Sequence, residues 1–328
     1  MARIFAYIAH KGGVADDTAA QLAAAAKQID SAASPTAILT GWGADLDIAC
    51  STLRASYSEI WKIASEALAY PNAELIRKAL VSVLPSDSIL LVAHEHFGID
   101  LAPGLSIKLN SAFVSDVLAI QGVEGHSLKV VRQEFGGQMN THVRCDISSS
   151  AVVTVRPGTF KPIESAAVAG RVVDKSSEIG TLAAGRRYLE TVVAEAGDVD
   201  ITKYNVLVSV GRGIQKPENV AIAQELAEAM GAAVSCSRPV VDAKWMEKSR
   251  QVGSSGKTVK PKVYLACGIS GAFQHLAGLK GSPFLIAINK NPKAPIFQVA
   301  DVGIVDDILE FLPELTNKVR EMRSVAAK

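Results

Sequence analysis

The chain has 328 residues, 48% of them hydrophobic, and its 34 lysines and arginines balance 33 aspartates and glutamates. This length and apolar content allow two domains with substantial cores, and they exclude a largely disordered chain. A net charge of +1 gives no electrostatic reason to expect nucleic acid or an anionic membrane surface as a partner.

The sequence also indicates the compartment. No apolar run is long enough to span a membrane, and the first residues, MARIFAYIAH, lack the apolar core and cleavage site of a signal peptide. The four cysteines, Cys50, Cys145, Cys236 and Cys267, are far apart, and none belongs to a CxxC motif. Free thiols are therefore favoured over a metal site or a disulfide framework. We expect a soluble, cytoplasmic protein without membrane insertion.

The first part of the chain alternates between strand and helix patterns. Strands are predicted at 4–9, 36–39, 59–63 and 88–93, with helices at 15–31, 46–54 and 72–83 between them. The run SILLVA at 88–93 is continuously apolar, as in a strand that is buried on both faces of a parallel sheet. The alternation predicts an N-terminal α/β domain with a parallel, nucleotide-binding-like sheet.

The pattern changes after residue 127. Three short strands are predicted at 128–135, 139–147 and 151–156, as neighbours joined by Gly136-Gly137 and by serines 148–150. A turn-rich segment, RPGTFKP at 156–162, follows. Residues 163–200 have weak periodicity and many small or polar residues, so we expect a linker there. The N-terminal domain, including this linker, is placed at residues 1–200.

A second α/β unit is expected at residues 201–328. Its strands are predicted at 205–210, 232–237, 263–268 and 284–289. A helix at 218–230 is closed by Gly231, a typical C-cap residue, and the end of the chain, 306–322, is predicted to be helical. This order indicates a Rossmann-like domain.

Polar or glycine-rich loops follow all four strands of the second unit. They are Gly211-Arg212-Gly213, Ser237-Arg238, Gly268-Ile269-Ser270-Gly271 and Asn289-Lys290. Ligands of open α/β sheets bind at the carboxyl ends of the strands, so these loops are expected to share one rim.

Each loop taken alone is weak evidence for a ligand-binding site. A lone Gly-Arg-Gly is typical of a tight strand-to-helix turn, although Arg212 could bind a phosphate. The segment QVGSSGKT at 251–258 fails the P-loop spacing, and a flexible surface loop is as good an interpretation as a ligand loop. A surface ion pair is the usual role of an arginine such as Arg238, and a lone histidine such as His275 is more often structural.

Taken together, the loops resemble a known family. The ordered blocks GRGIQKPENVAIAQELAEAMGAAVSCSRP, SRQVGSSGKTVKP, ACGISGAFQHLAG and AINKNPKAPIFQVADVGIVDD are similar to the C-terminal FAD domain of the electron transfer flavoprotein α subunit (also called FixB). RPGTFKP looks like the junction segment of that family. The resemblance covers residues 204–328, whereas the N-terminal part is similar in pattern only.

The resemblance implies an FAD site and a smaller β subunit as partner in a heterodimer. By matching position, the cofactor-binding residues would be Arg212, Ser237, Arg238, Gln251, Val252, Gly253, Ser254, Ser255, Ser270, Gly271, Ala272, Phe273, Gln274, His275, Asn289, Asp307 and Ile308.

The resemblance also implies individual roles. Arg238 is expected near the flavin ring and His275 near its C2 carbonyl oxygen, where both would favour the negative charge that reduction adds. Ser255 is expected near N5, and Asn289 and the backbone of the 270–275 loop are expected to help hold the pyrophosphate and ribityl chain. Many relatives have glutamine and threonine where Ser254 and Ser255 stand, so the hydrogen bonding at N5 differs here.

Three functions follow as hypotheses. The first is an electron carrier between a flavin dehydrogenase, of the acyl-CoA type that serves fatty acid β-oxidation or of the amine type, and a quinone oxidoreductase or similar acceptor. The second is the α subunit of an NADH-dependent, electron-bifurcating complex, and the third is a nucleotide-binding regulatory module without redox function. No nucleophile–base pair indicates an enzyme in its own right. His94-Glu95-His96 is interpreted as a strand-end loop, not a metal site.

Overall fold

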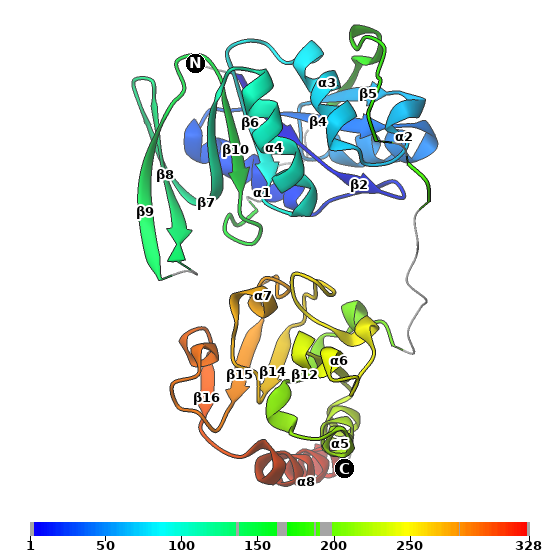
Figure 1. The fold of residues 1–328 in the computed structure, drawn as a ribbon, viewed down its shortest axis with the longest axis vertical. Coiled ribbons are helices and arrows are strands. Elements are labelled where there is room, and N and C mark those ends of the chain that lie inside the picture. Colours follow the sequence, from blue (N-terminus) through cyan, green and yellow to red (C-terminus); the bar gives the residue numbers. More distant parts are fainter. Residues whose placement is uncertain are drawn as a thin grey trace. The chain divides into compact units, whose positions relative to one another are not determined.

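The computed structural model describes residues 3–135, 138–162, 169–186, 188–190, 199–281 and 283–326. The chain divides into two compact units, Met1–Glu190 and Thr191–Lys328. Each unit has a sheet rich in parallel strands with helices on its faces, which confirms the predicted two-domain α/β class (Figure 1). In the part of the chain that is described, no helix has the length and apolarity that a membrane span requires.

The first unit contains a nine-stranded sheet among its described residues, in the order β11-β5-β4-β1-β6-β10-β7-β8-β9. Its strands are β1 (Arg3–Tyr7), β4 (Thr36–Gly41), β5 (Glu59–Ala64), β6 (Ser88–Ala93), β7 (Ala112–Glu124), β8 (Ser127–Glu134), β9 (Met139–Asp146), β10 (Ala151–Val155) and β11 (Arg171–Asp174). The strands from β11 to β7 are parallel, and β8 and β9 continue the sheet antiparallel. A two-residue hairpin, β2 (His10–Lys11) and β3 (Val14–Ala15), follows β1.

Helices cover both faces of this sheet. Helices α1 (Thr18–Ile29) and α2 (Gly43–Leu53) share one core cluster, while α3 (Ala73–Val83) and α4 (His96–Lys108) share the other. Successive residues of a strand point to opposite faces, so β1 sends alternate side chains into the two cores. Burial on both faces explains why the strands were recognisable as continuous apolar runs.

The predicted arrangement of the strands after residue 127 is partly wrong. β8 and β9 are antiparallel neighbours, as expected, and the turn predicted at Gly136-Gly137 lies outside the described residues. β10, however, does not lie beside β9, because it is inserted in parallel between β6 and β7. β7 and α4 were not predicted at all.

Part of the expected linker belongs to the first unit. Within 163–200, residues 171–174 form β11, which pairs in parallel with β5 at the edge of the sheet. Ile179 and Leu182 then pack against the second core cluster, and the ring of Tyr188 stacks on Tyr70 at 4.3 Å between centroids. The rest of the expected linker, residues 163–168, 187 and 191–198, lies outside the described part.

The second unit has a five-stranded parallel sheet in the order β13-β12-β14-β15-β16. Its strands are β12 (Val206–Val210), β13 (Ala233–Cys236), β14 (Val263–Cys267), β15 (Phe284–Ile288) and β16 (Val302–Ile304), the last of which was not predicted. Helices α5 (Val220–Met230) and α8 (Ile308–Ala326) pack on one face, and the short helix α7 (Phe273–Leu276) lies on the other. Gly231 ends α5 in the left-handed conformation, with φ of 66°, as predicted.

Candidate functional site

The strand order of the second unit determines where a ligand can enter. The chain goes from β12 outward to β13 and then crosses back to β14, on the other side of β12. The loops after β12 and β14 therefore diverge at the carboxyl edge, and such a switch point is the usual ligand crevice of an open α/β sheet. A cleft of about 670 Å³ lies at this point, within the range of small-molecule and cofactor sites.

All but four of the predicted site residues line this cleft. Those that line it are Arg212, Ser237, Arg238, Gln251, Val252, Gly253, Ser254, Ser255, Ser270, Ala272, Gln274, His275 and Asn289. The residues expected around the flavin ring, Arg238, Ser255 and His275, are thus brought to one cavity from three separate segments of the chain.

Two of the four remaining residues, Asp307 and Ile308, lie at the start of α8. The Asp307 carboxylate pairs with the Lys290 ammonium at 2.6 Å and accepts the backbone N–H of Leu309 at 3.0 Å. These hydrogen bonds hold the pKa of Asp307 below its usual range. Ile308 is buried in the core with α5. Neither side chain reaches the cleft, and their contact with a cofactor stays a prediction.

The other two residues, Gly271 and Phe273, belong to the loop after β14 and to the start of α7. Gly271 has φ of 86°, and a Cβ atom there would lie 2.3 Å from the backbone nitrogen of Ile296. Only glycine fits that approach. Phe273 begins α7 with 53% of its surface exposed.

Several lining residues were missed as binding candidates. Gly213, Gly268 and Ile269 were placed on the rim but not in the site, while Pro239, Asn291, Ala294 and Pro295 were not singled out. For Asn291, Ala294 and Pro295, the only available signal of a loop at the site was the asparagines and prolines of the segment after β15.

Glycines allow the loops of the cleft to pack backbone against backbone. A Cβ atom on Gly213 would lie 2.7 Å from the Cα atom of Gly268, so the loops after β12 and β14 touch directly. Gly253 has φ of 137°, and its Cβ atom would lie 2.8 Å from the carbonyl oxygen of Gln274. All four of these residues line the cleft.

The cleft is cationic. Arg212 and Arg238 line it, and no aspartate or glutamate is among its described lining residues. The Arg238 side chain is 67% exposed, and its Nε atom lies 3.4 Å from the Asp242 carboxylate. No hydrogen bond is recorded, among the described residues, from the backbone amides of Ser270 and Ala272. Arginine side chains beside unpaired amides are the donors that phosphate oxygens require.

Gln251 orients Ser255 within the cleft. Gln251 is only 3% exposed, and its side-chain amide donates a 2.8 Å hydrogen bond to Ser255 Oγ. Since the amide occupies an acceptor position of that oxygen, the Ser255 proton is available to a ligand.

His275 is nearly buried, with 6% of its surface exposed. Its Nε2 atom lies 2.8 Å from the hydroxyl of Tyr264, while Nδ1 is buried with no well-aligned partner in the described residues. Burial lowers the pKa of His275 to about 4, although the Val252 backbone partly opposes this shift. Tyr264 was not predicted as a site residue, because a tyrosine in an apolar strand is normally a core residue.

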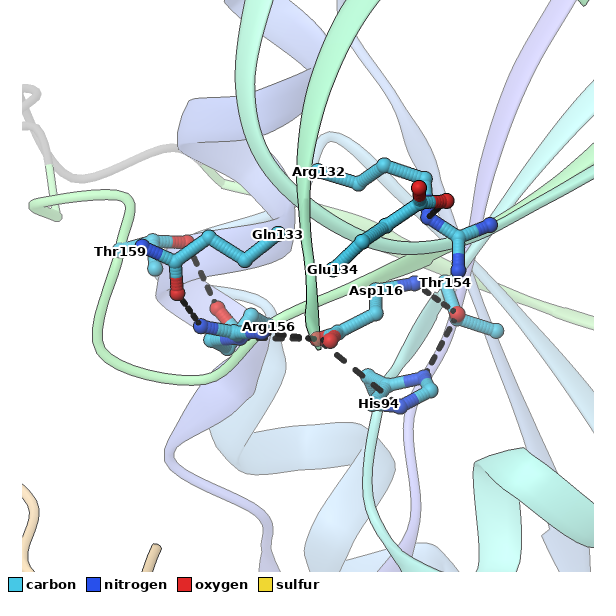
Figure 2. Close-up of polar contacts among 8 residues, drawn as sticks. All are labelled: His94, Asp116, Arg132, Gln133, Glu134, Thr154, Arg156 and Thr159. Carbon is cyan, nitrogen blue, oxygen red and sulfur yellow. Dashed lines mark hydrogen bonds and ion pairs between the residues drawn. The ribbon is translucent and has the colours of Figure 1, made fainter. Parts of the chain in front are cut away.

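A second polar cluster lies at the carboxyl edge of the sheet in the first unit (Figure 2). The Asp116 carboxylate accepts two hydrogen bonds from the Arg156 guanidinium, at 2.8 and 2.5 Å, and Arg156 also donates to Gln133. Thr154 Oγ1 lies 2.9 Å from His94 Nδ1 and accepts the backbone N–H of Asp116 at the same distance. The cluster joins β7, β8 and β10 and the end of β6.

This second cluster connects four strands through a buried threonine. Thr154 is 1% exposed, while the side chains of His94 and Asp116 keep 25% and 18% of their surface exposed. Burial lowers the pKa of His94, although Asp116 opposes the shift. No group of three or more potential metal ligands occurs among the described residues. His94 and Glu95 form the strand-end loop that was expected after β6, whereas His96 already begins α4.

Family models match residues in both units of the chain. A family model described as "Electron transfer flavoprotein domain" matches residues 4–184, more than half of the chain, and "Electron transfer flavoprotein FAD-binding domain" matches residues 200–280. The probable mitochondrial electron transfer flavoprotein subunit alpha of Cryptococcus neoformans is 33% identical over 96% of this chain and 91% of its own. The chain belongs to the electron transfer flavoprotein α-subunit family.

Two further relatives of this α subunit show the range of the family. Protein FixB of Clostridium saccharobutylicum is 38% identical over 72% of this chain and 71% of its own. The LctC subunit of the lactate dehydrogenase (NAD(+),ferredoxin) of Acetobacterium woodii is 34% identical over 76% of this chain and 59% of its own. Residues 200–280 are therefore an FAD-binding domain, and they include the loops that follow β12, β13 and β14.

The cleft of the α subunit fits FAD on three structural observations. It is cationic, which suits a pyrophosphate; it is walled by glycines where a Cβ atom would collide with backbone; and the buried Nδ1 atom of His275 lacks a partner. A buried polar atom without a partner is costly, and a ligand in the cleft could supply one.

Proposed function

We propose that this α subunit forms a heterodimer with an electron transfer flavoprotein β subunit and carries one FAD in the cleft at the β12/β14 switch point. It accepts electrons from flavin dehydrogenases and delivers them to an acceptor such as a quinone oxidoreductase. We further propose residues 201–328 as the FAD-binding domain and the seventeen residues carried over by resemblance as its cofactor contacts. The gathering of Arg238, Ser255 and His275 around one cationic cavity is the observation that carries the proposal.

The bound flavin supplies the redox chemistry, and the protein supplies binding and electrostatics. Arg212 and the free amides after β14 hold the phosphates. Ser255, oriented by Gln251, donates its hydroxyl proton toward the ring. Arg238 places a permanent positive charge at the cavity, and this charge favours the reduced, more negative ring. No side chain in this arrangement needs to act as a nucleophile, in keeping with a carrier.

A second candidate function is the α subunit of an electron-bifurcating complex. The observation that favours it is the similarity to LctC, a subunit of an enzyme whose name includes both NAD(+) and ferredoxin. A bifurcating complex would require a second flavin outside this cleft.

Flavin stoichiometry of the co-expressed heterodimer tests both functions. One FAD per heterodimer, reduced when a flavin dehydrogenase and its substrate are added, is the result expected of the simple carrier. Two FAD molecules per heterodimer, with reduction by NADH, would establish the bifurcating function instead. A folded heterodimer that is purified without any yellow chromophore, and that does not take up added FAD, would overturn both.

A further inference from the structure

The second unit buries the polar side chains of Ser209, Ser235, Tyr264 and His275, and His275 also lines the cleft. Ser209 of β12 and Ser235 of β13 are register partners, and both are fully buried. Tyr264 of β14 pairs with Leu207, two residues before Ser209, so it points to the same face of the sheet. His275 of α7 covers this group. The surrounding residues of this core are apolar.

Tyr264 and His275 share one hydrogen bond. The Tyr264 hydroxyl lies 2.8 Å from His275 Nε2, and the two ring centroids are 6.0 Å apart. Burial raises the pKa of Tyr264 well above its usual value, and the hydroxyls of Ser209 and Ser235 oppose this shift. Neither serine hydroxyl has another partner of standard geometry among the described residues. Both can therefore rotate to donate to the phenol oxygen.

The positions of the protons follow from these contacts. Tyr264 is protonated and His275 is neutral at physiological pH, so a single proton lies between the phenol oxygen and Nε2. If Ser209 and Ser235 both donate to the phenol oxygen, the proton of Tyr264 itself is directed at Nε2, 2.8 Å away. A neutral imidazole that accepts at Nε2 carries its own proton on Nδ1.

We propose that Tyr264 is a positioning residue that donates its hydroxyl proton to Nε2 and thereby holds His275 as the neutral Nδ1–H tautomer. The inference rests on the proposed function, because it assigns His275 to the FAD cleft. It makes the imidazole a neutral hydrogen-bond donor and leaves Arg238 as the permanent cation among the three residues expected around the ring. The serine hydroxyls stabilise the phenol oxygen as it donates.

The test is the tautomer of His275 in the FAD-loaded heterodimer, read by NMR after labelling with [15N]histidine. His275→Gln assigns the signals. At pH 7 the unmodified protein should show Nδ1 protonated and Nε2 unprotonated. A doubly protonated ring, or protonation at Nε2 alone, would overturn the proposal even before any variant of Tyr264 is made.

Tyr264→Phe removes the donor and keeps the ring. We expect the Nε2–H form to gain about fivefold or more relative to Nδ1–H, the size of effect that one buried hydrogen bond gives. The midpoint potential of the bound FAD should shift as well, because the donor that faces the cleft changes. Unchanged tautomer ratio and potential in a folded variant would refute the role of Tyr264.

A matched control is Tyr57→Phe in the first unit. Tyr57 is also buried, and its hydroxyl donates to the Ala19 carbonyl at 2.7 Å. This variant loses one buried hydrogen bond far along the chain from His275 and should alter neither the tautomer nor the potential. Loss of bound FAD from the unmodified heterodimer would instead contradict the proposed function, and the tautomer remains measurable in that case.

Discussion

The side-chain amide of Gln251 donates a hydrogen bond of 2.8 Å to Ser255 Oγ inside the cleft. This contact leads to the first prediction. Gln251→Glu replaces the amide donor by a carboxylate acceptor of the same shape, which turns the Ser255 proton away from the cofactor. We expect about tenfold weaker FAD binding and a lower midpoint potential, because one hydrogen bond to the ring is lost and a buried negative charge is added.

Fluorescence titration with FAD and potentiometry measure these effects. Gln224→Glu is the matched control, because Gln224 is exposed on α5 and does not line the FAD cleft. If Gln251→Glu binds FAD as tightly as the unmodified chain, Gln251 does not orient Ser255.

Gly253→Ala tests the backbone that walls the cleft. The added methyl group meets the carbonyl oxygen of Gln274 at 2.8 Å, and φ of 137° is strained for any residue except glycine. We expect the free energy of unfolding of the second unit to fall by about 1–3 kcal/mol, and FAD affinity to fall with it. Gly180→Ala is the control, since nothing lies within 4 Å of a Cβ atom there. Equal stability of the two variants in urea would contradict the expectation.

Arg238→Ala removes one of the two exposed arginines that line the cleft. We expect about tenfold weaker retention of FAD and a lower midpoint potential, because a charge-assisted contact to the cofactor is lost. Arg320→Ala serves as the control, because Arg320 pairs with Glu225 and does not line the cleft. Equilibrium dialysis and potentiometry provide the measurements. An unchanged potential would remove Arg238 from its proposed position near the ring.

Asp116 makes the stability of the first unit sensitive to acid. Burial by itself would raise the pKa of Asp116, but hydrogen bonds from Arg156 and nearby positive charges lower it below its ordinary value of 3.8. A carboxylate with a lowered pKa stabilises the fold above about pH 4, and this contribution is lost as pH falls further. Asp116→Asn should therefore cost about 1.5–3 kcal/mol at pH 7 and less at pH 3.

Urea unfolding at pH 3 and pH 7 measures the free energy of unfolding of Asp116→Asn and of the unmodified chain. Asparagine is suited to the position, because Asp116 has φ of 60° and asparagine tolerates that conformation. Asp242→Asn is the control, since its side chain is 62% exposed. A loss of stability that is the same at pH 3 and pH 7 would contradict the assignment of the acid sensitivity to Asp116.

Parts of the fold and of the site could be predicted from the sequence where a single local pattern identifies them. Apolar runs such as SILLVA mark strands that are buried on both faces, and the fixed order of parallel strands brings Arg212, Arg238 and Ser270 to one edge. Other elements could not be predicted, because contacts between residues far apart in the sequence determine their structure. β11 is a short, largely exposed strand whose pairing with β5 joins residues more than a hundred positions apart. Helix α4 contains Pro103 and two glycines, which favour a loop by local propensity.

The site residues also divide into those that a local sequence pattern identifies and those whose role depends on tertiary contacts. Loop residues at strand ends could be predicted, because ligands of open α/β sheets bind at the carboxyl ends of the strands. Tyr264 was missed because its role depends on His275 lying across from it, eleven residues later and on a different element. Asp307 and Ile308 are carried over from the resemblance alone; Asp307 pairs with Lys290, Ile308 packs in the core, and their contact with the cofactor stays a prediction.

The pairing of β11 with β5 has a practical consequence for dividing the chain. An unpaired edge strand presents a row of free backbone N–H and C=O groups to other molecules. A fragment that stops at Pro162 would lack β11, so that β5 would become an unpaired edge strand and the fragment would tend to self-associate. A fragment that continues to Glu190 retains β11 and the Tyr70–Tyr188 stack, so it should remain monodisperse where the shorter one aggregates.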